Sequence, residues 1–169
     1  MTPALVEAPT LRPVTLEEAR MHCRADHEFE DVLIDGYLLA AIGHLDGWSG
    51  VLGRCIMPQT WRVTADCAGW HVLPMPDVVT AVATYGDSST ETLAVTPTAA
   101  GPGVSLAGPA SIDFTCRMSE AGIDRVRVIV LQLVGLWYAN REAAVPVALQ
   151  QVPAAAQALI SALRWRAPL

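Results

Sequence analysis

The spacing of apolar residues changes twice along the chain, from helical to strand-like and back, and this order restricts the folds that the chain can adopt. Residues 26–50 carry apolar side chains at intervals of three and four, whereas residues 60–65 alternate. Helical spacing returns near Gly122. The order predicts an α+β fold: a helical bundle of two N-terminal and two C-terminal helices, with a small antiparallel β unit inserted in the middle.

The first helix is marked by a capping signal. Thr15 and Glu18 have the spacing of a capping box, in which each residue satisfies a backbone N–H of the other. This predicts a helix that runs to about Ala25. Prolines in residues 1–12 predict an irregular arm before it, because proline blocks regular structure. The two N-terminal helices together should cover about residues 14–50.

The second helix is expected to begin at Asp26, which can cap it. Acidic side chains in the following turn suit the positive end of the helix dipole. The helix should end near Gly50 or Gly53. Its buried stripe is predicted at Ile34, Tyr37, Leu38, Ala41, Leu45 and Trp48.

The β unit is predicted over about residues 58–118. Its strand candidates are rich in β-formers or alternate in polarity, and glycine and proline separate them. They are residues 60–65, 78–85, 91–95, 103–106 and 110–118. A chain of 169 residues falls within the usual size of one domain, so we expect a single domain over residues 1–169.

The C-terminal helices are predicted over about residues 122–165. The first of them is apolar nearly all round, and such a helix is normally enclosed. In a domain this small, a partner chain is expected to supply part of that enclosure. The predicted subunit interface is the second apolar stripe, Val128, Leu131, Val134 and Tyr138. Pro153 lies well for the first turn of a last helix, whose apolar face is Leu159, Ile160 and Leu163.

Composition excludes several classes of protein. Apolar residues make up 52% of the chain, which is enough to offset the entropy of ordering and excludes a disordered chain. The net charge of −6 argues against a general nucleic-acid binder. The longest apolar run, residues 128–139, is too short to span a bilayer, and no signal peptide is evident. We expect a soluble protein that does not associate with membranes.

The four cysteines show no paired spacing. Cys23, Cys55, Cys67 and Cys116 lie far apart in sequence, which favours isolated small apolar thiols. Disulfides are the alternative interpretation.

No catalytic, cofactor or metal site is predicted. The nucleotide-binding motifs are absent. Ser49 lies in a Gly-Trp-Ser-Gly segment that has the wrong spacing for a nucleophile elbow and ends a helix. His22 and His27 are five residues apart and would not share a helix face as metal ligands do. A small hydrolase or metalloenzyme that uses these residues remains the alternative from another class.

One polar motif is typical of an interface. Trp165 lies between Arg164 and Arg166 close to the C-terminus. Tryptophan and arginine are enriched at the residues that dominate binding energy in protein interfaces.

In their order and spacing, several segments resemble the head-tail connector, or adaptor, proteins of tailed phages and gene transfer agents. They are PVTLEEAR at residues 13–20 with His22 and Arg24, the acidic residues 26–31, GR at 53–54, PQTW at 58–61, LPMPDVV at 73–79, VP at 152–153 and residues 159–164. The resemblance covers nearly the whole chain.

The resemblance implies a structural virion protein that is not an enzyme and needs no cofactor. Its partners would be the portal protein, a tail-side stopper or tail terminator protein, and other copies of itself in a ring, usually a dodecamer. DNA would pass through the ring without sequence-specific binding. The ring would assemble in the bacterial cytoplasm and lie at the head-tail interface of the particle. A tail completion or stopper protein of the same particle is the alternative.

The resemblance also implies that the C-terminal segment reaches the portal. The residues expected to bind it are Leu159, Leu163, Arg164, Trp165 and Arg166. On this interpretation, removal of residues 154–169 should abolish portal binding and leave the fold nearly intact.

Overall fold

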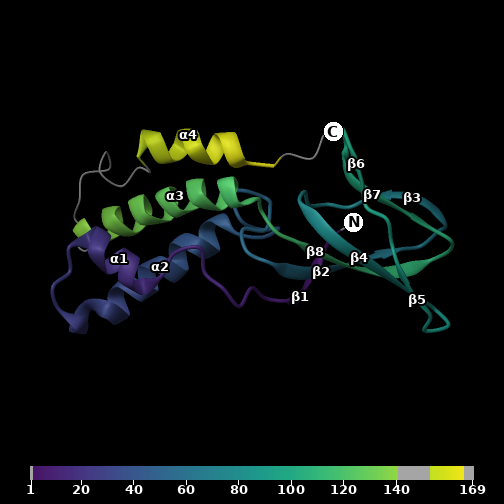
Figure 1. The fold of residues 1–169 in the computed structure, drawn as a ribbon, viewed down its shortest axis with the longest axis horizontal. Helices are drawn as coiled ribbons and strands as arrows, with labels where there is room; N and C mark the ends of the chain where they lie inside the picture. The colour runs from purple at the N-terminus through teal and green to yellow at the C-terminus, as the bar shows by residue number, and fades with distance from the viewer. Residues whose placement is uncertain (1, 141–152, 166–169) are drawn as a thin grey trace.

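The computed structural model describes residues 2–140 and 153–165. The molecule is elongated, with helices at one end and strands at the other (Figure 1). Helices α1 (Leu16–Cys23), α2 (Asp31–Leu45), α3 (Glu120–Ala139) and α4 (Ala154–Leu163) form the helical end. Since all strands except Ala4–Glu7 come between α2 and α3 in sequence, the predicted α+β fold with an inserted antiparallel β unit is confirmed.

The start of α1 is the capping box that the sequence predicts. The Thr15 hydroxyl accepts a hydrogen bond from the Glu18 amide at 3.2 Å, and the Glu18 carboxylate accepts one from the Thr15 amide at 2.8 Å. Arg24 ends the helix in the left-handed region, with φ of 54°. The helix therefore ends close to the predicted residue.

Both predicted ends of α2 are wrong. Asp26 does not cap it, because a short 3-10 helix at Glu28–Glu30 precedes α2, which begins at Asp31. The helix ends at Leu45, before the predicted glycines, because Asp46 adopts an extended conformation and turns its carboxylate to later residues. The side chain accepts hydrogen bonds from the Ile56 amide and from Gln59 Nε2, both at 2.7 Å. Trp48 consequently lies outside the helix and is exposed.

Two antiparallel sheets form the other end of the molecule. The larger has the order β1 (Ala4–Glu7), β2 (Gln59–Ala65), β8 (Ala110–Cys116), β4 (Val78–Tyr85), β5 (Thr90–Thr92). The smaller has the order β3 (Gly69–Val72), β7 (Gly101–Leu106), β6 (Thr96–Thr98). Strand β1 lies in the predicted irregular arm; its side chains are all exposed, so no alternation marked it.

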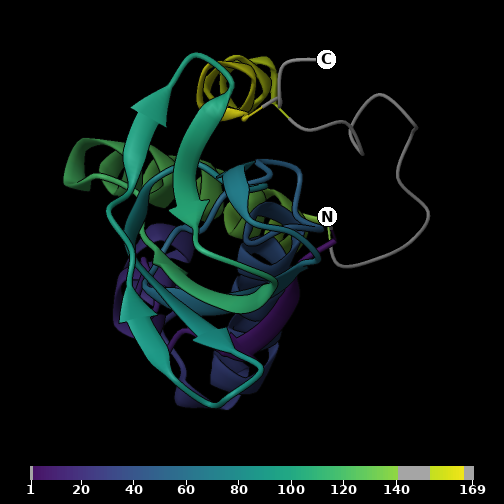
Figure 2. The ribbon, with the colours of Figure 1, turned by 90° about the vertical axis from the view of Figure 1, so that its right-hand side faces the viewer.

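The apolar side chains form two clusters, one at each end of the molecule. The helical core includes Ile34, Leu38, Leu52, Ile129 and Leu133, and the β core includes Cys55, Leu73, Met75, Ile112 and Phe114. Figure 2 looks along the molecule from its β end, with the strands in front of the helices. Among the described residues, no helix has the length and apolar character needed to cross a bilayer.

Candidate assembly surfaces

The last helix packs against its own chain. Ala156, Ile160 and Leu163 of α4 are buried in the helical core, and Leu159 packs against it. Two of the five predicted portal contacts, Leu159 and Leu163, therefore face the inside of their own subunit. The expectation that residues 154–169 can be removed with the fold nearly intact is wrong, because their loss would expose the core that α4 covers.

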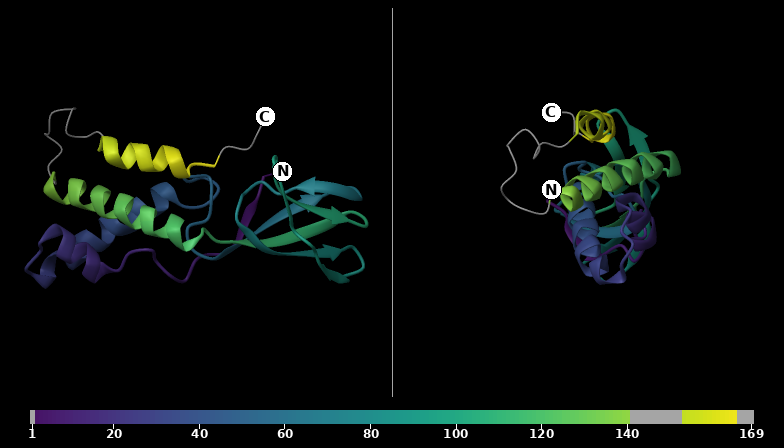
Figure 3. Two further views of the ribbon diagram at one scale, coloured as in Figure 1. Left: turned by 45° about the horizontal axis from the view of Figure 1, so that its top comes forward. Right: turned by 90° about the vertical axis from the view of Figure 1, so that its left-hand side faces the viewer.

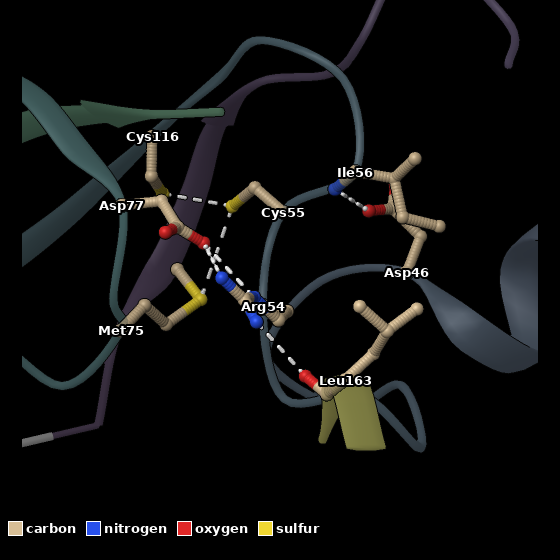
Figure 4. A network of polar contacts seen from close by, with 8 residues as sticks. All are labelled: Asp46, Arg54, Cys55, Ile56, Met75, Asp77, Cys116 and Leu163. Carbon is tan, nitrogen blue, oxygen red and sulfur yellow. Dashed lines mark hydrogen bonds and ion pairs between the residues drawn. The ribbon is translucent and has the colours of Figure 1, made fainter. Parts of the chain in front are cut away.

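Arg54 joins three separate segments at the junction between the two cores (Figure 4). Its Nε and Nη2 atoms donate to one carboxylate oxygen of Asp77, at 2.9 and 2.5 Å. Its Nη1 atom donates to the carbonyl oxygen of Leu163 at 2.9 Å. The guanidinium thus connects the loop after α2, the loop before β4 and the end of α4. Arginine suits this position because its donors point in fixed directions and it stays charged.

Trp165 follows the helix onto the β unit. Its amide donates to the carbonyl of Leu52 at 2.8 Å. Its ring lies close to Gly101, where an added Cβ would come within 3.4 Å of Cζ2. The ring also lines a groove of about 390 Å³ with Pro76, Val78, Val95, Pro97 and Pro102. Its indole Nε1 is buried, with no hydrogen-bond partner among the described residues.

Two arginines, Arg164 and Arg166, flank Trp165. The Arg164 side chain is exposed beyond the end of α4, and Arg166 lies outside the described residues. Of the predicted portal contacts, Arg164 thus offers the most accessible side chain among those that the structure describes.

Two cysteines meet at the same junction. Cys55 Sγ and Cys116 Sγ lie 2.8 Å apart, and Cys55 Sγ lies 4.0 Å from Met75 Sδ (Figure 4). All four cysteines are free, so no disulfide forms, but these two are not isolated as the sequence suggested. The hydrogen bond with Cys55, and then burial, raise the pKa of the Cys116 thiol. A neutral buried thiol is a poor nucleophile, so the pair has a packing role.

Helix α3, which carries the predicted subunit interface, is enclosed mainly by its own chain. Helices α1, α2 and α4 all pack against it. Val134 is fully buried and has no surface to offer to a neighbour, while Leu131 and Tyr138 are half-buried against the helical core. Val128, at 45% exposed, is the member of the predicted set that a second chain can reach.

The outward face of α2 is a surface that the sequence interpretation missed. Val32 is 85% exposed, Leu39 is 49% exposed and Leu33 is 38% exposed. The other outward residues of the helix are Gly36, Ala40, Gly43 and His44. A Cβ added at either of the two glycines would meet nothing within 4 Å, so packing inside the subunit does not require them. We name these seven residues the α2 face.

A signal for the α2 face was present in the sequence. Between Val32 and Leu45 the acidic and basic residues are Asp35, which pairs with Arg12, and His44 in the last turn. The prediction for this helix concerned only the side that was expected to be buried, and the opposite side was not considered as a contact surface. A helix whose opposite side is also uncharged is typical of an element that meets other protein on both sides.

The residues considered for catalysis do not come together. Ser49 is exposed in the turn after α2, and His22 is exposed on α1. His27 is exposed and stacks on Phe29, with ring centroids 5.1 Å apart. Within residues 2–140 and 153–165, no group of three histidine, cysteine, aspartate or glutamate side chains is placed to hold a metal ion.

Comparison with known proteins finds similarity in solved structures. No family model matches the chain, and no curated protein sequence matches it. A chain from the neck of an empty gene transfer agent particle, computed with C6 symmetry, aligns with a TM-score of 0.70 and 20% identity, over 100% of this chain and 98% of that one. A chain from the virion of a native gene transfer agent particle aligns with a TM-score of 0.67 and 18% identity, over 100% and 98% of the two chains.

A third structure, the neck of a native gene transfer agent particle computed with C12 symmetry, contains a chain with a TM-score of 0.61 and 16% identity. That alignment covers 98% of this chain and 97% of the other. At these identities the likeness shows a shared fold over the whole chain. It is the fold that the sequence resemblance implied.

Proposed function

We propose that the chain is a structural subunit of the neck of a virus-like particle, where it forms an adaptor ring that joins the portal of the head to the tail. The observation that carries the proposal is the fold match along the whole chain to chains of gene transfer agent necks. The order of motifs from residue 13 to residue 164 supports it. The subunit would be made in the bacterial cytoplasm and become part of the particle.

The similar chains belong to assemblies computed with C6 and C12 symmetry, which supports a ring of copies, with twelve as the proposed number. The ring would form part of the DNA channel. A subunit with a net charge of −6, repeated around a channel, repels DNA. This repulsion suits a conduit through which DNA must pass without sticking.

The proposed portal contact is the end of α4. Arg164, Trp165 and Arg166 would touch the portal, and Leu159 and Leu163 would hold α4 on its own core so that this end is presented. The exposure of Arg164 and the anchoring of the α4 end by Arg54 support this division of roles. A tail completion or stopper protein would use its contacts on the tail side instead.

Co-expression with the portal protein alone tests the proposal. The chain should co-purify with the portal, and Arg164→Glu should reduce the amount recovered at least roughly tenfold, because it reverses a charge in an interface. Arg125→Glu, which changes another exposed arginine, on α3, is the matched control and should bind normally. Binding only to a tail-side component would overturn the adaptor assignment in favour of a stopper.

A further inference from the structure

We infer that neighbouring subunits in the ring contact each other through the α2 face of one copy and the outward face of α4 in the next. The inference rests on the proposed function, which supplies the ring. It adds which two surfaces meet and that the contact is head-to-tail.

The outward face of α4 resembles the α2 face in lacking charge and differs from it in size. Its exposed residues are Ala154, Ala155, Gln157, Ala158, Ser161 and Ala162. The buried residues of α4 lie on the opposite side and pack against the helical core. We name this exposed set the α4 face. It is small and nearly flat, whereas Val32, Leu33 and Leu39 project from the α2 face.

The two faces lie on opposite sides of the helical end. Helices α2 and α4 both pack against α3. The view along the molecule in the right panel of Figure 3 shows α4 on one side of α3, with α1 and α2 on the other. Figure 1 shows the same order from another direction. The α2 face and the α4 face therefore point away from each other, and a subunit can use both at once.

This placement matches the geometry of a ring. A contact between two different surfaces on opposite sides of a subunit is head-to-tail, and it closes into a ring when the rotation between copies allows. A two-fold contact would instead match the α2 face with itself and leave the α4 face unused. The similar chains come from cyclic assemblies, which favours the head-to-tail arrangement and makes a second copy the occupant.

The side chains of the two faces are complementary in size and in charge. Large apolar groups on one helix fit against small residues on the other, and small residues let two helix axes approach closely. Neither set contains Asp, Glu, Lys or Arg, and His44 lies at the end of the α2 face, so the contact buries no unpaired carboxylate or guanidinium. The outward side of α1, by contrast, carries Glu17, and the exposed Arg24 follows the end of that helix, so this side would not bury as readily.

The contact is small, which has a consequence for assembly. Helix α2 has 15 residues and is about 22 Å long, so its outward side covers well under the ~800 Å² per partner of a typical stable interface. Free copies should associate weakly. Copies held side by side on a portal have a high effective concentration, and the same contact then closes the ring.

Cysteine cross-linking in purified particles tests the inference. The background variant is Cys67→Ser, which removes the exposed native thiol. Leu39→Cys is added in the middle of the α2 face and Ala158→Cys in the middle of the α4 face. After treatment with a short bis-maleimide, the variant with both changes should give a ladder of linked oligomers. The background and either single change should give none.

Three outcomes would overturn the inference while leaving the proposed function in place. Dimers from Leu39→Cys alone would show a two-fold contact. A ladder from Leu39→Cys with Val128→Cys, but not with Ala158→Cys, would make α3 the receiving surface. If particles that contain the protein give no cross-linked oligomers, the α2 face does not take part in the ring contact. Absence of the wild-type chain from purified particles is a different result, because it would overturn the proposed function and this inference with it.

Discussion

The outward face of α2 and the outward face of the large sheet are both exposed in one subunit, but they are made of different residues. Across β2, β8 and β4 the outward side chains are mostly threonine and serine, in cross-strand rows such as Thr64, Ser111 and Thr84. The charged pair among them, Arg62 and Asp113, forms two hydrogen bonds at 2.6 and 2.7 Å. The α2 face offers valine, leucine, glycine and alanine, with His44 at its end and no Asp, Glu, Lys or Arg.

The difference indicates what each surface contacts. The outward side chains of the sheet are mostly polar and can stay in water. Leaving a large apolar side chain exposed forgoes roughly 1.5–3 kcal/mol relative to burying it, so the α2 face is stabilised only when something covers it. Large exposed apolar patches commonly mark protein–protein contacts. On the proposed function, we therefore expect the subunit contacts at the helical end and expect the outer sheet to face solvent.

The largest expected effect comes from placing a charge on the α2 face. Val32 is 85% exposed, so Val32→Asp should fold normally. It should lower incorporation into particles by at least roughly tenfold, because the contact would bury an unpaired charge. Incorporation is measured as the amount of the chain relative to the portal in purified particles.

Val79→Asp on β4 is the matched control for that variant. Val79 is 64% exposed and lies on the sheet, so the same substitution there should leave incorporation unchanged. Equal incorporation of both variants would show that the α2 face does not differ from the sheet in function.

The next effect concerns the junction that holds the two ends of the molecule together. Arg54→Ala removes the half-buried ion pair with Asp77 and the bond to the Leu163 carbonyl. We expect a loss of about 2 kcal/mol in the free energy of unfolding, measured by chemical denaturation. Arg54→Lys should recover only part of it, because lysine cannot reproduce the fixed directions of the guanidinium. A loss near zero would contradict the role of Arg54 as the link between the cores.

A smaller, pH-dependent effect is expected at Asp46, which ends α2 and so limits the extent of its apolar face. Burial raises the pKa of this carboxyl, and hydrogen bonds from Ile56 and Gln59 partly oppose the rise. Because the folded pKa lies above the ordinary value of 3.8, the favourable contribution of this group is complete below that value and is lost as pH rises through the folded pKa.

Asp46→Asn tests this sign. The amide cannot accept from both donors, so the variant should be about 1 kcal/mol less stable than the wild type near pH 4. The difference should narrow as pH rises above that range, because only the wild type loses stability through this group. Denaturation curves at a series of pH values measure the difference in the free energy of unfolding between the wild type and Asp46→Asn. A difference that widens as pH rises would contradict the raised pKa of Asp46.

The smallest effect is expected on the sheet surface. The Arg62 and Asp113 side chains are 51% and 31% exposed, so water and salt weaken their attraction. Arg62→Ala should lower the free energy of unfolding by much less than Arg54→Ala does. It should leave incorporation into particles unchanged. A cost equal to that of Arg54→Ala would remove the distinction between the two ion pairs.

The sequence predicted the elements that have strong local signals. The capping box of Thr15 and Glu18 fixed the start of α1, alternation marked β2 and β4, and glycine and proline breaks delimited β8. The end of α2 could not be predicted, because it depends on contacts that the Asp46 carboxylate makes with residues beyond the helix. Strands β3 and β6 were missed because their short segments show no clear alternation and depend on pairing with β7.

The assembly surfaces were only partly predictable. The apolar character of α3 was evident, but the sequence could not show that α1, α2 and α4 of the same chain would enclose it. The α2 face was missed for the same reason, because the burial of one side of a helix does not show what covers the other side. The contact between Cys55 and Cys116 was unpredictable, because their separation in sequence of 61 residues gives no hint of it.

Imaging of intact particles from the source of this chain decides whether the chain forms the proposed ring. We expect a ring of copies of the chain seated on the portal, with α2 of each copy against α4 of the next. A map in which this chain is absent from the neck, or in which its ring lies only on the tail side without touching the portal, would contradict it.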